Sequence, residues 1–207
     1  MTTPSIYGSG AIFLLVGPGG VGKNTLMHEI FPLFDDLHQV PTATTRAMRP
    51  GEAEGREHYF IDEPTFIHWR DTDKLVEWEE VHPGKWYGVV RAPLENAFRT
   101  NTFLIADVEM AGAQKVKAAY PDNAILIFIA PPAEGDKDPL QVLEERMRAR
   151  GEKEDGIRKR MARAPREMDF SSQCAYRITN DEVGRASKEL AQMIQHERQT
   201  RLAHQPE

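Results

Sequence analysis

Almost unbroken apolar runs, separated by longer amphipathic stretches, form the main pattern along the chain. Residues 11–16, 102–108 and 124–130 each have the length of a strand and hardly any polar position. Such runs are typical of strands buried on both faces of a parallel sheet. Helices are expected at about 23–31, 111–119, 140–150, 156–168 and 182–198, with a last strand at 175–179. This alternation predicts a three-layer α/β domain with a mainly parallel sheet.

Other segments do not follow this alternation. Residues 49–56 are rich in turn formers and residues 75–90 are rich in aromatic side chains. Together they predict a small β-rich insertion from about Arg46 to Val90. Pro32 is expected to end or kink the first helix, residues 131–139 are expected to form a loop, and the tail after Arg198 is expected to be frayed.

Composition limits the class of protein. A chain of 207 residues corresponds to one domain, and its one cysteine, Cys174, excludes an internal disulfide framework. Nothing approaches a membrane span of about 18 apolar residues, and the N-terminus lacks the pattern of a secretion signal. We therefore expect a soluble cytoplasmic protein with no membrane partner; the oligomeric state is not predicted.

Charge is distributed unevenly. The formal net charge of −6 argues against a general partner of nucleic-acid polymers. Between Arg146 and Arg166, however, nine Lys or Arg residues stand against three acidic ones. One interpretation is a device for binding a compact polyanion; the other is a solvated helix pair with ion pairs along its surface.

A glycine-rich turn follows the first predicted strand directly and precedes a predicted helix. Its sequence, Gly17-Pro-Gly-Gly-Val-Gly-Lys-Asn-Thr25, is a P-loop in the required context. Glycines let successive backbone N–H groups converge on phosphates, and the lysine adds a cation. Asn24 stands where the pattern has a hydroxyl for Mg²⁺, and an amide oxygen is an acceptable ligand for this hard cation. The candidate nucleotide ligands here are Gly17, Gly19, Gly20, Val21, Gly22, Lys23, Asn24 and Thr25.

Further motifs follow in a fixed order. Thr44–Gly55 reads T-T-R-x-x-R-P-G-E-x-x-G, and Glu77-Trp78 and Tyr87-Gly88 come later in the expected insertion. They are followed by Asp107-Val-Glu-Met-Ala-Gly112, Ala130-Pro-Pro132, Arg146-x-x-x-Arg-Gly151 and Asn180-Asp181. With the P-loop, these motifs make residues 11–195 resemble the guanylate kinase family.

The resemblance implies a P-loop nucleoside monophosphate kinase fold. Its core would cover about 8–45, 91–139 and 168–198, with an NMP-binding insertion at about 46–90 and a helical lid at about 140–167. It implies transfer of the γ-phosphate of ATP to GMP or dGMP, with Mg²⁺ as the cofactor.

The resemblance also assigns residues. Those expected at GMP are Thr42, Arg46, Arg49, His58, Glu77, Tyr87 and Glu109. Asn180 is expected near the adenine of ATP, and Asn24 and Asp107 near the metal, through water for the aspartate. The catalytic cations would be Lys23, Arg46, Arg146, Arg150 and Arg160. Glu77 also suits guanine on chemical grounds, because a carboxylate accepts from N1–H and the 2-amino group, donors that adenine lacks.

Several positions depart from the family pattern. His58 stands where a phosphate-binding tyrosine is expected, Val89 replaces a serine, Glu109 replaces an aspartate and Ala111 a glutamine. With Asn24, these changes leave two alternatives open. One is a non-catalytic guanylate-kinase-like module that binds a protein; the other is a P-loop kinase for a different, deoxy or modified, nucleoside monophosphate.

Overall fold

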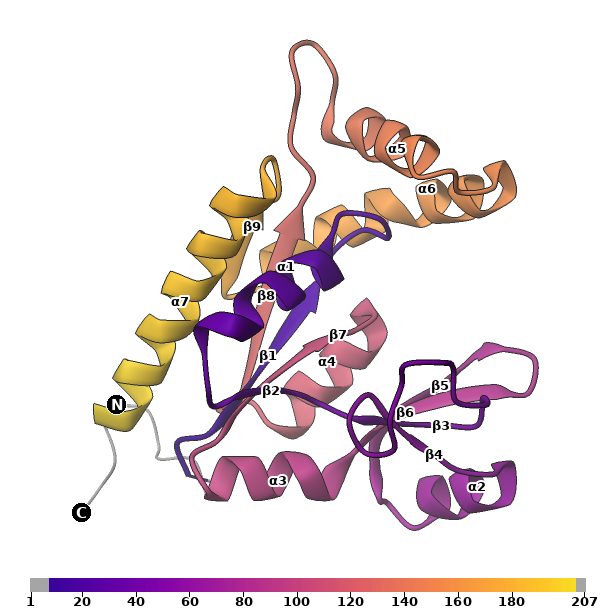
Figure 1. Cartoon of the computed structure of the whole chain (residues 1–207), viewed down its shortest axis with the longest axis vertical. Coiled ribbons are helices and arrows are strands. Elements are labelled where there is room, and N and C mark those ends of the chain that lie inside the picture. Colours follow the sequence, from indigo (N-terminus) through magenta and orange to yellow (C-terminus); the bar gives the residue numbers. More distant parts are fainter. Residues whose placement is uncertain (1–7, 204–207) are drawn as a thin grey trace.

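A parallel five-stranded sheet forms the centre of the molecule in the computed structural model, which describes residues 8–203 apart from the side chain of His82 (Figure 1). Its strand order is β2-β7-β1-β8-β9, and all neighbouring strands run parallel. The strands are β1 (Ala11–Val16), β2 (Leu37–Gln39), β7 (Phe103–Asp107), β8 (Ala124–Ala130) and β9 (Tyr176–Thr179). The predicted α/β architecture with a mainly parallel sheet is confirmed.

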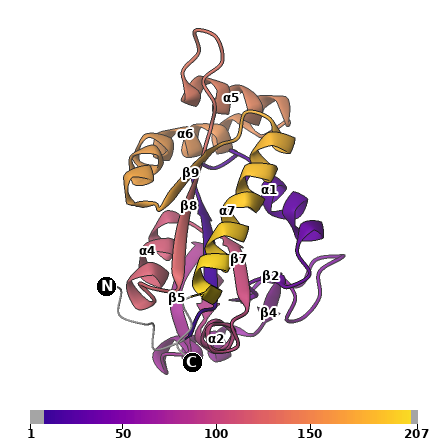
Figure 2. The ribbon, with the colours of Figure 1, turned by 90° about the vertical axis from the view of Figure 1, so that its left-hand side faces the viewer.

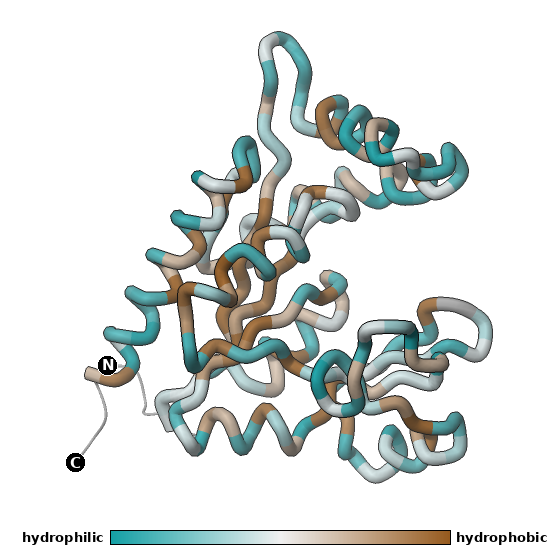
Figure 3. The backbone as a smooth tube through the Cα atoms, in the orientation of Figure 1, coloured by the Kyte–Doolittle hydropathy of each residue, from teal (hydrophilic) through white to brown (hydrophobic). Residues whose placement is uncertain are grey.

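Helices cover both faces of this sheet, which stands edge-on between them in Figure 2. Every residue of β1 is buried, and alternate side chains enter opposite layers. Phe13 and Leu15 pack toward α1 (Lys23–Ile30) and α7 (Val183–Ala203), whereas Ile12 and Leu14 pack toward α3 (Arg91–Arg99) and α4 (Met110–Ala119). The apolar core therefore follows the central strands, as Figure 3 shows.

A second, four-stranded sheet lies beside the core at the lower right of Figure 1. Its order is β4-β3-β6-β5, with β3 (Thr42–Thr44), β4 (His58–Phe60), β5 (Leu75–His82) and β6 (Lys85–Val90). A helix that the sequence pattern did not indicate, α2 (Glu63–Asp71), packs Phe66 into a small core of its own with Ala43, Leu75 and Val90. This sheet begins at Thr42, before the expected insertion boundary at Arg46.

Two helices project from the opposite end of the core, at the upper right of Figure 1. They are α5 (Pro139–Ala149) and α6 (Glu154–Asp169), and the short 3₁₀ helix η2 (Phe170–Gln173) follows them. The segment before α5 is a loop, as predicted, and Asp138 caps the helix by accepting from the backbone N–H groups of Leu140 and Gln141.

Some local expectations are confirmed and others are corrected. The expected end of the first helix at Pro32 is confirmed, because α1 ends at Ile30 and Pro32 lies in the 3₁₀ turn η1 (Phe31–Leu33) that follows it. The last helix does not fray after Arg198 but runs to Ala203. Strand β2 and helix α3 were not anticipated. No helix within residues 8–203 has the length and apolarity needed to cross a membrane.

Candidate functional site

The P-loop joins β1 to α1 and depends on glycine at two tight positions. Gly17 has φ +140° and Gly22 has φ +101°, conformations that other residues rarely adopt. An added Cβ would lie 2.2 Å from the Ile129 carbonyl oxygen at Gly17 and 2.5 Å from Asn180 Nδ2 at Gly22. Val21 is buried, whereas Asn24 and Thr25 are exposed in the first turn of α1. The loop therefore has the backbone geometry that the motif predicts.

Lys23 closes this loop and faces a carboxylate at the end of β7. Its Nζ donates to the Gly17 carbonyl oxygen at 2.7 Å and lies 3.6 Å from Asp107 Oδ1. Burial raises the pKa of Asp107, the charge of Lys23 opposes this rise, and Glu109 adds to it. Asp107 thus lies at the carboxyl end of a central strand, and nearby cations stabilise its charged form.

These residues fit a magnesium ion that is held mainly by phosphates and water. Such an ion takes only one or two protein carboxylates, and Asp107 beside Lys23 supplies one. No cluster of three potential ligands from His, Cys, Asp or Glu occurs within residues 8–203. Asn24 lies next to Lys23 in the chain and offers an amide oxygen.

Two arginines of the α5–α6 unit lie on the P-loop. Arg150 donates through Nη1 to the Gly20 carbonyl oxygen at 3.0 Å, and Arg160 Cδ lies 3.1 Å from where a Gly19 Cβ would be. Glu152 pairs with both guanidinium groups, at 2.9 Å from Arg150 and 3.4 Å from Arg160. Two cations remote in sequence from the loop are therefore held over it.

Arg146 has a different environment from the other two. It donates to the main-chain carbonyl oxygens of Asn180 at 2.7 Å and Asp181 at 3.2 Å. Asn180 is buried and donates through Nδ2 to the Val21 carbonyl oxygen at 2.8 Å. Arg146 and Asn180 therefore tie the loop after β9 to the P-loop and α5.

Three further basic residues of this segment form ion pairs along the helix surface. Arg148 pairs with Glu144 and Glu154, and both Arg158 and Lys159 pair with Asp155. The interpretation as surface ion pairs therefore applies to these three residues, and binding of a polyanion stays a prediction for the others. Arg150 and Arg160 reach the P-loop, whereas exposed neighbours neutralise one another.

A second cationic group lies in the smaller sheet. Arg46 donates to both carboxylate oxygens of Glu52, at 2.7 and 2.5 Å, and to Tyr87 Oη at 3.0 Å, and its guanidinium lies 5.5 Å from the Phe60 ring centroid. The guanidinium lowers the pKa of Glu52 to about 2, with help from the Arg49 backbone N–H. The Arg49 residue itself is exposed. Glu52 is thus an anion of the protein itself, bound at the fork that the two terminal guanidinium nitrogens of Arg46 form.

His58 lies beside this fork. Its Nδ1 is 2.7 Å from Thr42 Oγ1, and its ring meets those of Phe60 and Tyr87 edge-on at 5.5 and 5.8 Å. Burial lowers the pKa of His58, and the charge of Arg46 lowers it further. The sheet therefore brings Thr42, Arg46, His58 and Tyr87 together on one face.

Glu77 projects from β5 onto helix α4. A Cβ on Gly112 would lie 3.1 Å from both Cδ and Oε2 of Glu77, so the missing side chain makes room for the carboxylate. Burial raises the pKa of Glu77 to about 7, Lys115 opposes this shift and Glu79 adds to it. Val89 is its register partner on β6.

The segment from the end of β7 to the start of α4 connects the P-loop with Glu77 of the second sheet. Asp107 faces Lys23, and Gly112, only five residues later, lies against Glu77. Five residues span at most about 18 Å even when fully extended, so the P-loop and the second sheet lie close together along this segment. Glu109, between them, is exposed and adds negative charge near Asp107.

Sequence reasoning missed three acidic residues at this site. Glu52 lies inside the quoted arginine motif and Glu152 directly follows another, which are the only signals the sequence offers. Glu167 of α6 has a buried Oε2 without a described hydrogen-bond partner. Burial and Glu109 raise the pKa of Glu167, whereas Lys23 and the Gly19 backbone lower it. No pattern in the sequence of α6 indicates that Glu167 lies near Lys23 and the Gly19 backbone of the P-loop.

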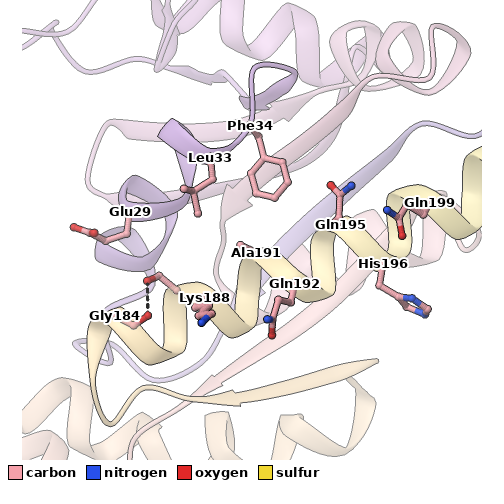
Figure 4. Close-up of a pocket in the computed structure, with 11 residues that line it drawn as sticks. Glu29, Leu33, Phe34, Gly184, Lys188, Ala191, Gln192, Gln195, His196 and Gln199 are labelled. Atoms are coloured by element: carbon pink, nitrogen blue, oxygen red, sulfur yellow. Dashed lines mark hydrogen bonds between the residues drawn. The ribbon is translucent and has the colours of Figure 1, made fainter.

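A hollow on another part of the molecule carries none of this chemistry. It has a volume of about 650 Å³ and lies between α1, η1 and α7 (Figure 4). Leu33, Phe34 and Ala191 contribute apolar surface, and the α7 side is mostly polar. None of the residues predicted for nucleotide binding lines it, so it is not the candidate site.

Comparisons with known proteins agree with this arrangement. A model of the guanylate kinase family matches residues 9–197. A guanylate kinase of Synechocystis sp. is 35% identical over 89% of this chain and 93% of its own length. One from Bordetella pertussis is 37% identical over 90% and 83%, respectively. The crystal structure of guanylate kinase from Anaplasma phagocytophilum superimposes with a TM-score of 0.66 at 25% identity, covering 91% of this chain and 86% of that one. The chain therefore belongs to the guanylate kinase family.

Proposed function

We propose that this protein transfers the γ-phosphate of ATP to GMP or dGMP and releases ADP together with GDP or dGDP, respectively. The observation that carries this proposal is the short link between the group of residues at the P-loop and the group of the second sheet that contains Glu77. Within five residues of one another, Asp107 faces Lys23 of the P-loop and Gly112 contacts Glu77 of the second sheet. Two anionic nucleotides bound to these groups would share one reaction space.

The P-loop side suits the triphosphate donor. The backbone of Gly17, Gly19, Gly20, Val21 and Gly22 would surround the phosphates, together with the start of α1 at Asn24 and Thr25. Lys23 would neutralise the outer phosphates, and Asn180 would lie near the adenine. Arg150 and Arg160, already over the loop, would contact the γ-phosphate, while Arg146 of α5 would act from its place beside the loop after β9.

The second sheet suits a guanine nucleotide. Arg46 and Arg49 would bind the acceptor phosphate with Tyr87 and His58, and the phosphate would replace Glu52 at the Arg46 fork. Thr42 and Glu77 would read the base. The ionised Glu77 carboxylate accepts two hydrogen bonds from guanine, and adenine would leave that charge unpaired.

Phosphoryl transfer requires positioning of the two nucleotides and charge neutralisation more than it requires proton transfer. An acceptor phosphate oxygen attacks the γ-phosphorus in line, and the bond to the ADP oxygen breaks. Because that acceptor is already anionic, no general base is needed. Lys23, Arg46, Arg150 and Arg160 would balance the charge on the transferred group. Mg²⁺, held near Asp107 and Asn24, would neutralise phosphate charge when bound.

We further propose three functional parts for the chain. The parallel sheet and its helices would form the core, residues at about 46–90 the acceptor-binding insertion, and residues at about 140–167 the lid. Closure of the last two over both nucleotides would exclude water, which otherwise competes with GMP as the phosphoryl acceptor.

A coupled assay of ADP formation tests the proposal. The acceptors are GMP, dGMP, AMP, CMP and UMP, each with ATP and Mg²⁺. We expect rapid turnover with GMP and dGMP and at least a hundredfold lower kcat/KM with AMP, because AMP leaves Glu77 unpaired. Turnover only with an acceptor that lacks guanine would replace the substrate assignment. No turnover with any of the five would instead favour the protein-binding module.

A further inference from the structure

Lys115 lies on helix α4 one turn beyond Gly112, which packs against the candidate base-reading carboxylate of Glu77, and it belongs to none of the motifs above. Gly112 and Lys115 are three residues apart and therefore occupy the same side of the helix. Gly112 contacts the Glu77 carboxylate, with the Cβ position 3.1 Å from its Oε2. The Lys115 Nζ donates to the Trp78 carbonyl oxygen at 3.4 Å. One side of α4 thus holds both the Glu77 side chain and the main chain beside it.

The Trp78 side chain adds a second contact with the same lysine. Lys115 Nζ lies 5.6 Å from the Trp78 ring centroid, and the Arg70 guanidinium lies 5.3 Å from it. Cations at such distances from an indole ring are attracted to it. These contacts keep the lysine near β5 although the residue is exposed.

We propose that Lys115 is a positioning residue for the acceptor base, which keeps Glu77 in its charged form and aligns β5 with α4. This inference rests on the proposed role of Glu77 in binding guanine. A protonated Glu77 would present a hydroxyl to one of the guanine donors and lose a hydrogen bond. The charge of Lys115 therefore sets how much of the enzyme is competent to bind GMP at neutral pH.

The charges around Glu77 agree with this role. Burial raises its pKa to about 7, so that its ionisation is balanced near neutrality. Lys115 from α4 lowers the pKa, Glu79 from the same strand raises it, and the Val89 backbone of β6 lowers it. Lys115 is the cation among these groups. Without it, burial and Glu79 would raise the pKa of Glu77, and of these groups only the Val89 backbone would lower it.

The test measures the Glu77 titration directly in the full-length protein. Glutamate labelled with ¹³C at Cδ gives the midpoint by NMR, and Glu77→Gln identifies the resonance. We expect Lys115→Met to raise the midpoint by about half to one pH unit, and Lys115→Arg to keep it near that of the wild type. Added salt raises the wild-type midpoint toward that of Lys115→Met, because it screens a partly exposed pair. Lys85→Met, which removes a charge from the neighbouring strand β6, is the matched control and leaves the midpoint unchanged.

The same variants separate positioning from general loosening of the fold. A midpoint one unit higher would raise the KM for GMP about fivefold at pH 7 and hardly at pH 9. An equal rise at both pH values, or an unchanged midpoint in Lys115→Met, would overturn the proposal. If Lys115→Met fails to fold, an absent salt dependence in the wild type overturns it instead. Because NMR needs no nucleotide, a protein that does not bind GMP would contradict the proposed function without affecting this result.

Discussion

At the scale of single residues, the candidate site contains two kinds of charged group: a paired arginine and a buried carboxylate. Arg46 is bound by Glu52, an anion that the acceptor phosphate would replace under the proposed function, whereas Glu77 is a carboxylate whose burial disfavours its charge. The first arrangement would hold the Arg46 cation in the geometry that phosphate binding requires. The second would let the carboxylate gain from two guanine donors what it lost in hydration.

Glu77→Gln is expected to impair acceptor binding selectively. The amide keeps one acceptor but places a donor against a guanine N–H group. Because a hydrogen bond to a charged group contributes about 1.5–3 kcal/mol, the KM for GMP should rise roughly 10- to 100-fold, with the KM for ATP within about twofold. Steady-state kinetics check this, with Glu79→Gln on the same strand as the control. Equal rises in both KM values would contradict the assignment of Glu77 to guanine.

The same substitution is expected to change stability in a pH-dependent way. The folded-state pKa of Glu77, about 7, lies above its ordinary value of 4.5. Its stabilising contribution is therefore complete below pH 4.5 and is lost as the pH rises through 7. The Tm of the wild type should thus fall relative to that of Glu77→Gln between pH 5 and pH 8. A difference in Tm that stays constant over this range would show that Glu77 is not held in a desolvating environment.

Asn24→Ser tests the departure in the P-loop. If Asn24 acts only as a substitute metal ligand, the serine hydroxyl restores the usual donor, and kcat is retained or raised. The measurement is kcat as a function of Mg²⁺ concentration, and the half-saturating concentration should stay equal or fall. A loss of activity of more than tenfold would instead assign Asn24 a role that a hydroxyl cannot fill.

At the scale of elements, some basic side chains at helices α5 and α6 lie over the P-loop and others lie on the exposed surface. Arg150 and Arg160 lie over the P-loop and share Glu152, whereas Arg158 pairs with Asp155 away from it. A helix carries residues three or four apart on one side, so the same basic segment serves both the site and the solvated surface.

Arg150→Ala and Arg158→Ala therefore form a matched pair. Loss of a cation that stabilises charge on the transferred phosphoryl group should lower kcat by about 100-fold or more. Loss of the exposed Arg158 should change kcat by less than about twofold. Initial rates at saturating ATP and GMP give both values. Similar kcat values for the two variants would remove Arg150 from the proposed reaction space.

The elements also differ in how far their sequence predicts them. β1 and β8 have their predicted limits, because a strand buried on both faces is one continuous apolar run. α3 was missed although its buried positions Leu94, Ala97 and Phe98 have helical spacing, because the helix has only nine residues and Pro93 lies within it. α2 was hidden for a related reason, because Phe66 alone is its buried residue.

Site residues divide in a similar way. Lys23 and Arg46 could be predicted because their motifs fix local backbone and charge. The contacts of Glu167 and Lys115 depend on how α6 and α4 pack against segments far away in sequence, and those of Glu152 depend on how the turn between α5 and α6 folds. No local pattern records such packing, so only the folded chain reveals these residues.

At the scale of the whole molecule, the second sheet and the α5–α6 pair lie on the same side of the core, one below and one above in Figure 1. The central sheet fixes the P-loop at the carboxyl ends of its strands, where ligands of open α/β sheets bind. The start of α4 contacts the second sheet through Gly112. The account therefore depends on one shared space for donor and acceptor.

Calorimetric titration with adenosine and guanosine joined 5′ to 5′ through five phosphates tests this claim most directly. We expect one molecule to bind per chain, and the saturated protein to bind neither ATP nor GMP. If the saturated protein still binds GMP at full stoichiometry, the two cationic groups do not share one reaction space, and the central claim is contradicted.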